Sequence, residues 1–198
     1  MDKLLKIRIR LDEALTYRSV DMAKRLAQQG LRLAQYEELV GEIAYFKGQI
    51  EILNENYSKA ITHLKRAIKY NPRDGASYND IALCMVELDK IDEAFKYFDQ
   101  GIEVEPNYAT IYHNKGWLLN RIGKHKKAIS YFKKALELDP KRSVTYENLA
   151  YALTQLGDYK GSLAAYCKAL ELLKPEYVDV KESLLEEVKK LKQIVDSK

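Results

Sequence analysis

The sequence contains few of the residues that break helices or cross-link chains. Only two cysteines, Cys84 and Cys167, occur among 198 residues, and they are far apart in the chain. This is not a disulfide framework, and such cysteine usage favours a reducing compartment. Nine glycines and four prolines leave little material for loops. Long helices with short connections are therefore the expected architecture.

Long apolar runs are also absent. Residues 1–15 interrupt their apolar residues with Lys, Arg and Asp, so this segment lacks the apolar core of a signal peptide. No stretch approaches the roughly 18 apolar residues that a membrane-spanning helix needs. We therefore expect a cytoplasmic protein that does not insert into membranes.

Positive charge is only slightly in excess over negative charge, and the excess lies in the N-terminal segment. The net charge is +4, from 33 basic and 29 acidic side chains. Residues 1–35 contain eight basic residues, including Arg18, and four acidic residues, including Asp2. This difference accounts for the whole positive excess of the chain. This segment is either a solvated helix face or a surface for nucleic acid or an acidic partner.

A 34-residue repeat dominates the rest of the chain. Four units, 41–74, 75–108, 109–142 and 143–176, align without gaps, and small residues recur at three positions. Small side chains let neighbouring helices approach closely, whereas larger ones would overpack the contact. The small residues are Gly48, Ala82, Gly116 and Ala150 at the eighth position, Ala60, Ala94, Ala128 and Ser162 at the twentieth, and Ala67, Gly101, Ala135 and Ala169 at the twenty-seventh.

Turn residues separate the two halves of these units and the units themselves. Gly123 and Gly157 follow the first apolar stripe of their units, where a helix end needs a residue that reaches positive φ. Pro72, Pro106 and Pro140 stand near the ends of three units, because a helix does not continue comfortably through proline. Each unit is therefore predicted to be a pair of helices.

These residues resemble the tetratricopeptide repeat family over residues 41–175. The resemblance implies an all-α fold, a right-handed superhelix of stacked helix pairs in which residues 1–198 form a single solenoid domain. Residues 4–40 place Ala23 at position twenty and Gly30 at position twenty-seven, so they are interpreted as a degenerate repeat followed by about four extra residues. In unit 41–74, Ala44 replaces the large residue that is usual at position four. Unit 41–74 is therefore expected to meet its N-terminal neighbour in a non-standard way.

The C-terminal segment, residues 176–198, is predicted to be a capping helix. Leu184, Val188, Leu191 and Val195 recur at helical spacing and leave charged residues on the other faces. Repeat arrays need a terminal element with a polar outer surface to remain soluble.

The family resemblance also implies a binding surface. In this family the first helix of each unit lines a concave groove that holds an extended peptide or a helix of a partner protein. The groove positions of these units are occupied by Tyr45, Gln49, Asn79, Asp80, Leu83, His113, Asn114, Trp117, Arg121, Glu147, Asn148 and Tyr151.

Two features of this set leave alternatives open. Trp117, the only tryptophan, shares the ninth position with Leu83 and Tyr151, which either form an apolar strip along the groove or pack within the array. Asp80, Asn114 and Asn148 recur at the sixth position. Amides there either pair with a peptide backbone or serve the fold itself.

The predicted function is that of a scaffold or adaptor that binds a peptide or helical segment of another protein. The three histidines fall at unrelated repeat positions, and neither a phosphate-binding loop nor a metal-ligand spacing occurs, so no enzyme activity, metal or cofactor is expected. RNA binding and self-association are the alternatives. A regular ladder of base-reading positions is missing, which argues against nucleic acid, while a homo-oligomer remains open.

Overall fold

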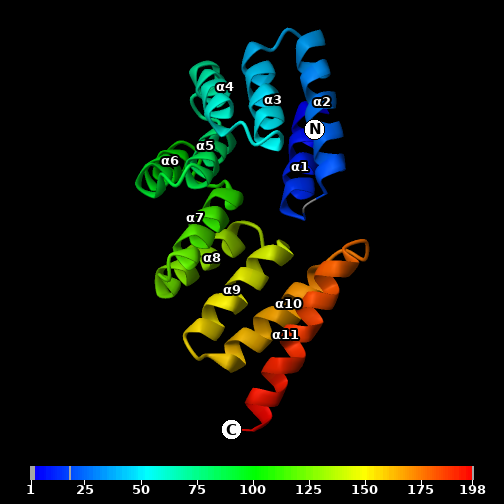
Figure 1. The fold of residues 1–198 in the computed structure, drawn as a ribbon, viewed down its shortest axis with the longest axis vertical. Coiled ribbons are helices and arrows are strands. Elements are labelled where there is room, and N and C mark those ends of the chain that lie inside the picture. Colours follow the sequence, from blue (N-terminus) through cyan, green and yellow to red (C-terminus); the bar gives the residue numbers. More distant parts are fainter. Residues whose placement is uncertain (1–2, 18, 198) are drawn as a thin grey trace. The chain divides into compact units, whose positions relative to one another are not determined.

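Helices account for the regular structure of the chain (Figure 1). The computed structural model describes residues 3–17 and 19–197, which form eleven helices and no strand, so the predicted all-α class is confirmed. Asp2, Arg18 and Lys198, which entered the sequence-based predictions, lie outside the described residues. The helices are α1 (Lys3–Thr16), α2 (Val20–Tyr36), α3 (Val40–Leu53), α4 (Tyr57–Tyr70), α5 (Gly75–Glu87), α6 (Ile91–Val104), α7 (Ala109–Arg121), α8 (His125–Leu138), α9 (Ser143–Gln155), α10 (Tyr159–Leu172) and α11 (Val178–Asp196).

Two compact units divide the chain. Residues 1–106 form the first unit with α1 to α6, and residues 107–198 form the second with α7 to α11. Each of the four full repeats contributes one helix pair, in which the two helices pack against each other along their length. None of the described helices is both long and apolar enough to cross a membrane.

Tight turns of one kind join the helices within these pairs. Gly123 and Gly157 adopt φ angles of 75° and 79°, as predicted for the ends of first helices. Glu55 and Asp89 occupy the equivalent turns with φ angles of 60° and 57°, although neither is a glycine. In the turn after α7, the N–H of Lys124 donates to the carbonyl of Leu119 at 2.8 Å, which satisfies a carbonyl at the helix end.

The small residues at the eighth position allow the close helix approach that the repeat predicts. A Cβ at Gly116 would lie 2.8 Å from the ring of Phe132, and one at Gly48 would lie 2.8 Å from the side chain of Leu64. Both distances are shorter than van der Waals contact allows. Phe132 and Leu64 stand at the same repeat position and have no exposed surface, so they fill the space that the glycines leave open.

The extra residues between the degenerate repeat and Gly41 mostly lengthen its second helix. α2 has 17 residues, whereas α4, α6, α8 and α10 have 14 each, so the added length is helical and not an extended linker before Gly41. α2 and α3 are then joined by a tight turn in which Glu38 has a φ of 54°. The N–H of Leu39 donates to the carbonyl of Ala34 at 2.9 Å, the same bond that closes turns inside the other helix pairs.

The longer α2 covers a face of α3 that the repeat pattern predicts to point inward. Phe46 of α3 stands at the sixth position of its repeat, has no exposed surface and packs against Gly30 so closely that a Cβ there would overlap its ring. The other three repeats have polar, half-buried residues at this position, Asp80, Asn114 and Asn148. α3 therefore meets its N-terminal neighbour in a non-standard way, as the sequence predicts.

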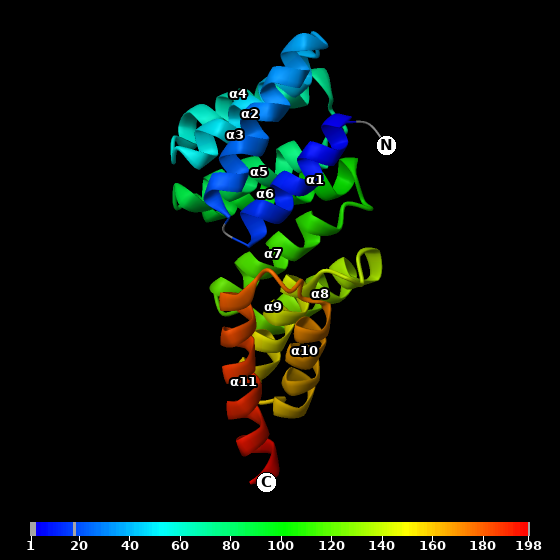
Figure 2. The ribbon, with the colours of Figure 1, turned by 90° about the vertical axis from the view of Figure 1, so that its right-hand side faces the viewer.

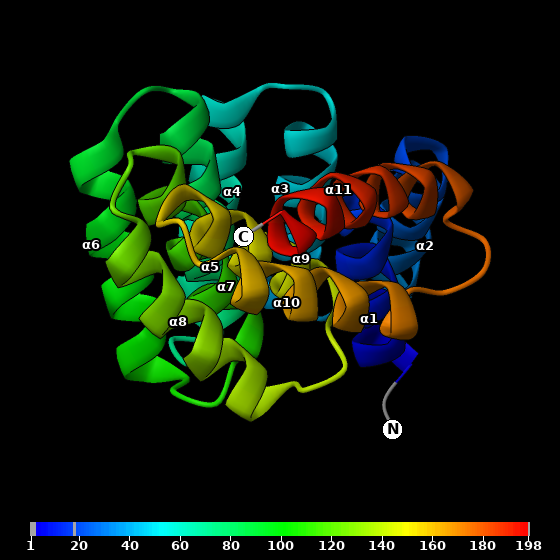
Figure 3. The ribbon, with the colours of Figure 1, turned by 90° about the horizontal axis from the view of Figure 1, so that it is seen from below.

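The C-terminal helix α11 forms the predicted cap of the second unit. Figures 2 and 3 show it running alongside α10. Leu184, Val188 and Leu191 are buried in one apolar cluster with Tyr166 of α10 and Ala150 of α9. Three of the four residues of the predicted apolar stripe therefore dock on the last helix pair, whereas Val195 is half-buried and outside this cluster.

Candidate peptide-binding surfaces

The structure sorts the twelve predicted groove residues by their exposure. Buried side chains cannot contact a ligand without rearrangement, so this sorting decides which residues are available for binding. Four are buried: Tyr45, Gln49, Asn79 and His113. Six are half-buried: Asp80, Leu83, Asn114, Trp117, Glu147 and Asn148. Two are exposed: Arg121 and Tyr151.

Tyr45 lies in an ionic cluster centred on Arg8, which extends from α1. The Arg8 guanidinium lies 3.7 Å from the centre of the Tyr45 ring. It donates to Glu42 at 2.9 Å and to Asp74 at 2.6 Å, and the Arg8 side chain is only 15% exposed. A desolvated cation over an aromatic ring and between two carboxylates is a strong contact. Arg8 thereby ties α1 to α3 and to the start of α5.

Asp74, the carboxylate at the centre of this cluster, also orders the start of α5. Its Oδ2 accepts a hydrogen bond from the Ser77 hydroxyl at 2.6 Å. The backbone N–H of Gly75 donates at 2.9 Å to Glu105, the residue that follows α6 (Ile91–Val104). These carboxylates satisfy donors at the positive end of α5, where negative charge is stabilised. The cluster therefore serves the fold of the first unit.

Gln49 and Asn79 bind a carboxylate of this unit. Asp80 accepts from Gln49 Nε2 at 2.5 Å and from Asn79 Nδ2 at 3.0 Å. Burial raises the pKa of Asp80 to about 7, in spite of these two hydrogen bonds, which act in the opposite direction. The sixth-position carboxylate and its two amides thus join α3 to α5.

His113 of the second unit is a packing residue as well. Its Nδ1 lies 3.0 Å from the Thr145 hydroxyl of α9, and its ring lies 5.9 Å from that of Phe132. Burial lowers the pKa of His113 to about 3, and the positive charge of Arg142 acts in the same direction. His113 is therefore neutral at physiological pH and connects α7 to α9.

Trp117 and Tyr151 remain accessible on α7 and α9 of the second unit. Tyr151 is 47% exposed, and Trp117 is half-buried with the Arg121 guanidinium 5.6 Å from its ring. An aromatic ring with a neighbouring cation offers an apolar surface and a charge to the same ligand. Leu83, the third member of the predicted strip, belongs to the first unit, and its place in a continuous strip stays a prediction.

A chain of polar side chains supports Tyr151. His125 contacts the Tyr151 ring edge-on at 6.3 Å between centroids, and its Nδ1 lies 2.5 Å from Asn120 Oδ1. Asn120 in turn donates to the backbone carbonyl of Asn148 at 3.4 Å. These contacts join the start of α8 to α7 and α9, so Trp117 and Tyr151 stand on helices that are fixed to each other.

Comparison with known sequences decides the family. Models described as tetratricopeptide repeat match residues 47–101, 75–141 and 131–164, and so extend over residues 47–164 without a break. The chain belongs to the tetratricopeptide repeat family. Comparison with curated protein sequences gave no significant match.

Solved structures share the fold of this tetratricopeptide repeat protein. TTC0263 of Thermus thermophilus, described as a thermophilic TPR protein, has a TM-score of 0.73 at 19% identity, covering 93% of this chain and 98% of its own. MamA of Desulfovibrio magneticus RS-1 has a TM-score of 0.57 at 20% identity, with 87% and 96% covered. YrrB, described as a TPR protein with an unusual peptide-binding site, has a TM-score of 0.56 at 16% identity, with 87% and 88% covered. At these identities the likeness concerns the fold alone.

The repeat numbering also contains signals for contacts that the sequence analysis missed. Extending it into the degenerate tetratricopeptide repeat places Arg8 at the fifth position, which Tyr45, Asn79 and His113 occupy in later units. All four of these side chains are engaged inside the protein. A basic residue at an inward position of the degenerate repeat could therefore have been used to predict a contact with the next helices. Its engagement also removes one cation from the basic N-terminal segment that motivates RNA binding.

Proposed function

We propose that this tetratricopeptide repeat protein is a cytoplasmic protein-interaction module that binds a peptide or helical segment of a partner on the surface of α7 and α9. The observation that carries the proposal is that Tyr151 is exposed and Trp117 only half-buried at the same repeat position of α9 and α7. Large aromatic residues are costly to leave in water, and they are the residues that most often dominate binding energy in protein interfaces.

Polar groups around the two aromatic residues suit an extended peptide. Asn114 and Asn148 are half-buried at the sixth positions of the same helices. The Asn148 Nδ2 donates to the carbonyl of Val144 at 2.9 Å, so its amide oxygen is the group that we propose accepts from a peptide N–H. Arg121 and Glu147 add one charge of each sign. The proposed contact set omits Tyr45, Gln49, Asn79 and His113, because they are buried.

Peptide selection with a counter-screen tests this proposal. Random peptides are selected on the wild-type protein, and their affinity is measured through the fluorescence of Trp117, the only tryptophan. Because truncation of an interface aromatic residue costs about 2 kcal/mol or more, Trp117→Ala should weaken binding by about 30-fold, measured by anisotropy of labelled peptides.

The matched control is Tyr36→Ala, which removes an 87% exposed aromatic residue in the first unit. This variant should bind the selected peptides like the wild type, and both variants should keep the helical circular dichroism spectrum. Peptides that bind Trp117→Ala and wild type equally would refute the proposed surface.

Self-association stays the second candidate, and α11 supplies the observation in its favour. Val178 and Leu185 of α11 are 55% and 48% exposed and lie outside its buried stripe. If this face joins two copies, light scattering at high protein concentration will give twice the monomer mass, and Leu185→Glu will return the mass to that of a monomer. A wild-type protein that stays monomeric at all concentrations would remove this candidate.

A further inference from the structure

Two neighbouring helices of the first unit carry opposite charges on their exposed faces. Every charged residue of α4 is basic, since this helix, which is described in full, contains no aspartate or glutamate. The exposed face of α6 carries four acidic residues and a single lysine, Lys96. The exposed charges of α4 are Lys59, Lys65, Arg66 and Lys69, and the acidic ones of α6 are Asp92, Glu93, Asp99 and Glu103. Each helix thus presents a row of charges of one dominant sign.

The sign of the charge reverses at equal positions of the two repeats. Residues 34 apart occupy the same position of consecutive repeats, so their side chains stand on corresponding sides of α4 and α6. Three such pairs, at the nineteenth, twenty-fifth and twenty-ninth positions, are oppositely charged: Lys59 and Glu93, Lys65 and Asp99, and Lys69 and Glu103. The basic row and the acidic row are therefore equivalent surfaces of opposite sign.

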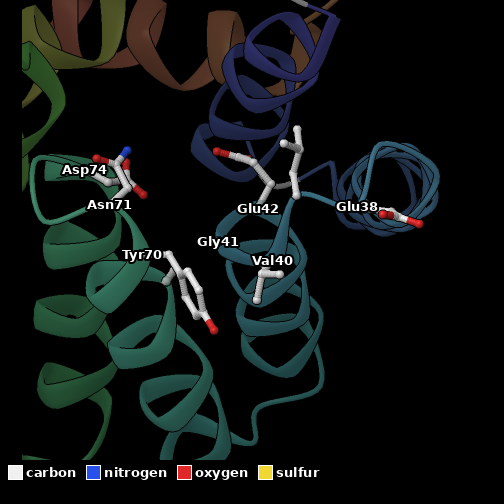
Figure 4. A pocket seen from close by; sticks show the side chains of 9 residues that line it. Glu38, Val40, Gly41, Glu42, Tyr70, Asn71 and Asp74 are labelled. Carbon is white, nitrogen blue, oxygen red and sulfur yellow. The ribbon is translucent and has the colours of Figure 1, made fainter.

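α4 and α6 lie close enough for the two rows to form one surface. Both helices pack against α5, and short connections make each of them run opposite to α5, so α4 and α6 run in the same direction (Figure 1). The Lys65 Nζ atom lies 5.9 Å from the centre of the Tyr97 ring of α6. The open pocket of about 330 Å³ between α3 and the end of α4 (Figure 4) is lined, among the described residues, by none of the basic residues of α4. The charged surface is thus separate from that pocket.

The charges of this surface are not neutralised within their own helices. On α8 of the second unit, Lys134 at the twenty-sixth position pairs with Glu137 at the twenty-ninth, at 3.0 Å. α4 has Arg66 and Lys69 at these positions, and like charges on neighbouring turns destabilise a helix. Within the described part of the chain, Arg66 and Lys69 make no ion pair, and neither does Glu103 of α6. These charges are therefore available to a partner of complementary sign.

We propose that the surface formed by α4 and α6 binds the same surface of a second copy of this protein, with α4 of each copy against α6 of the other. A two-fold axis parallel to the helices brings equal repeat positions together, so Lys59 of one copy faces Glu93 of the other. A two-fold axis across the helices would place the basic row against itself, which like-charge repulsion disfavours. The charge pattern therefore selects one symmetric dimer. Neither Trp117 nor the exposed residues of α11 take part, so this dimer does not depend on the proposed function.

Salt dependence is the first test of this dimer. A single exposed ion pair contributes little, so the dimer depends on several pairs acting together and on weak screening by salt. Sedimentation velocity at about 0.05 M salt should show a dimer of the wild-type protein, and at about 1 M salt its dissociation constant should rise by about tenfold or more. A wild-type protein that is monomeric at low salt and the highest soluble concentration, or a dimer that high salt leaves unchanged, would overturn the proposal.

A charge swap tests the arrangement of the helices. Lys59→Glu/Lys69→Glu and Glu93→Lys/Glu103→Lys change only exposed residues, so both proteins are expected to fold. Each variant alone places like charges opposite each other and should dimerise about 100-fold more weakly than the wild type. An equal mixture of the two should restore the dimer, because each α4 then faces an α6 of opposite charge. Two variants that stay monomeric when mixed would rule out this pairing of helices.

Two control variants separate this dimer from other effects of charge and from the α11 candidate. Lys127→Glu/Lys133→Glu reverses two exposed charges at the nineteenth and twenty-fifth positions of α8, and this protein should dimerise like the wild type. Leu185→Glu, which disrupts the exposed face of α11, should also leave the dimer in place. If Leu185→Glu abolishes the dimer, or if the α8 variant weakens it as much as the α4 variant does, the surface of α4 and α6 is not the interface.

Discussion

Replacing Arg8 with alanine is expected to lower the free energy of unfolding by about 3–5 kcal/mol. The Arg8 side chain is 15% exposed and is held by Glu42, Asp74 and the ring of Tyr45. Removing the cation leaves the Asp74 carboxylate, itself only 9% exposed, without its main counter-charge. The cost of that uncompensated charge exceeds the value of the ion pair, because water cannot replace the guanidinium at a buried site.

Arg10→Ala is the matched control for this prediction. Arg10 belongs to the same helix but is exposed, so its loss should change the free energy of unfolding by less than about 0.5 kcal/mol. Urea denaturation followed by circular dichroism measures both variants. Similar unfolding midpoints for Arg8→Ala and Arg10→Ala would show that the ionic cluster contributes little to the stability of the protein.

Acidification is expected to destabilise the protein through His113. The pKa of His113 is lowered to about 3 in the folded state, against 6.5 for an ordinary histidine. The unfolded chain therefore takes up a proton first as the pH falls below 6.5, and the folded state does not follow until about pH 3. Within that window His113 makes unfolding easier by on the order of 1 kcal/mol per pH unit. Its contribution is fully present above pH 6.5.

The variant His113→Gln isolates this effect. Glutamine keeps a hydrogen-bonding group near Thr145 but does not titrate, so the loss of stability between about pH 6.5 and 4 should become smaller than in the wild type. Thr145→Val, which removes the hydroxyl beside His113 but keeps the histidine, is the control and should retain most of the pH dependence. Asp80 acts in the opposite direction, because its raised pKa destabilises the folded state as the pH rises from 3.8 to about 7. Comparing each variant with the wild type at the same pH removes the contribution of Asp80, because Asp80 is present in all of these proteins.

The sequence alone was sufficient for the helix pairs of the repeats. The small residues at fixed positions and the apolar stripe of α11 act between helices that are close together in the chain, and the glycines at positions 123 and 157 act within one turn. Such local requirements recur with the repeat, so they can be read from its period. The twelve predicted groove residues follow from the same numbering, but the numbering identifies only the side of the helix on which a residue stands.

Only the tertiary structure decided which of these sides is covered. Arg8 reaches partners 34 and 66 residues away, and Phe46 is buried against Gly30 of α2, a helix that is three residues longer than α4. The inward side of α3 is closed by Arg8 of α1 over the Tyr45 ring and by Asp80 of α5, which accepts from Gln49. A periodic sequence specifies the faces of each helix, whereas burial depends on the position of its neighbours. That position is set by helix lengths and turn angles that act together over the whole first unit.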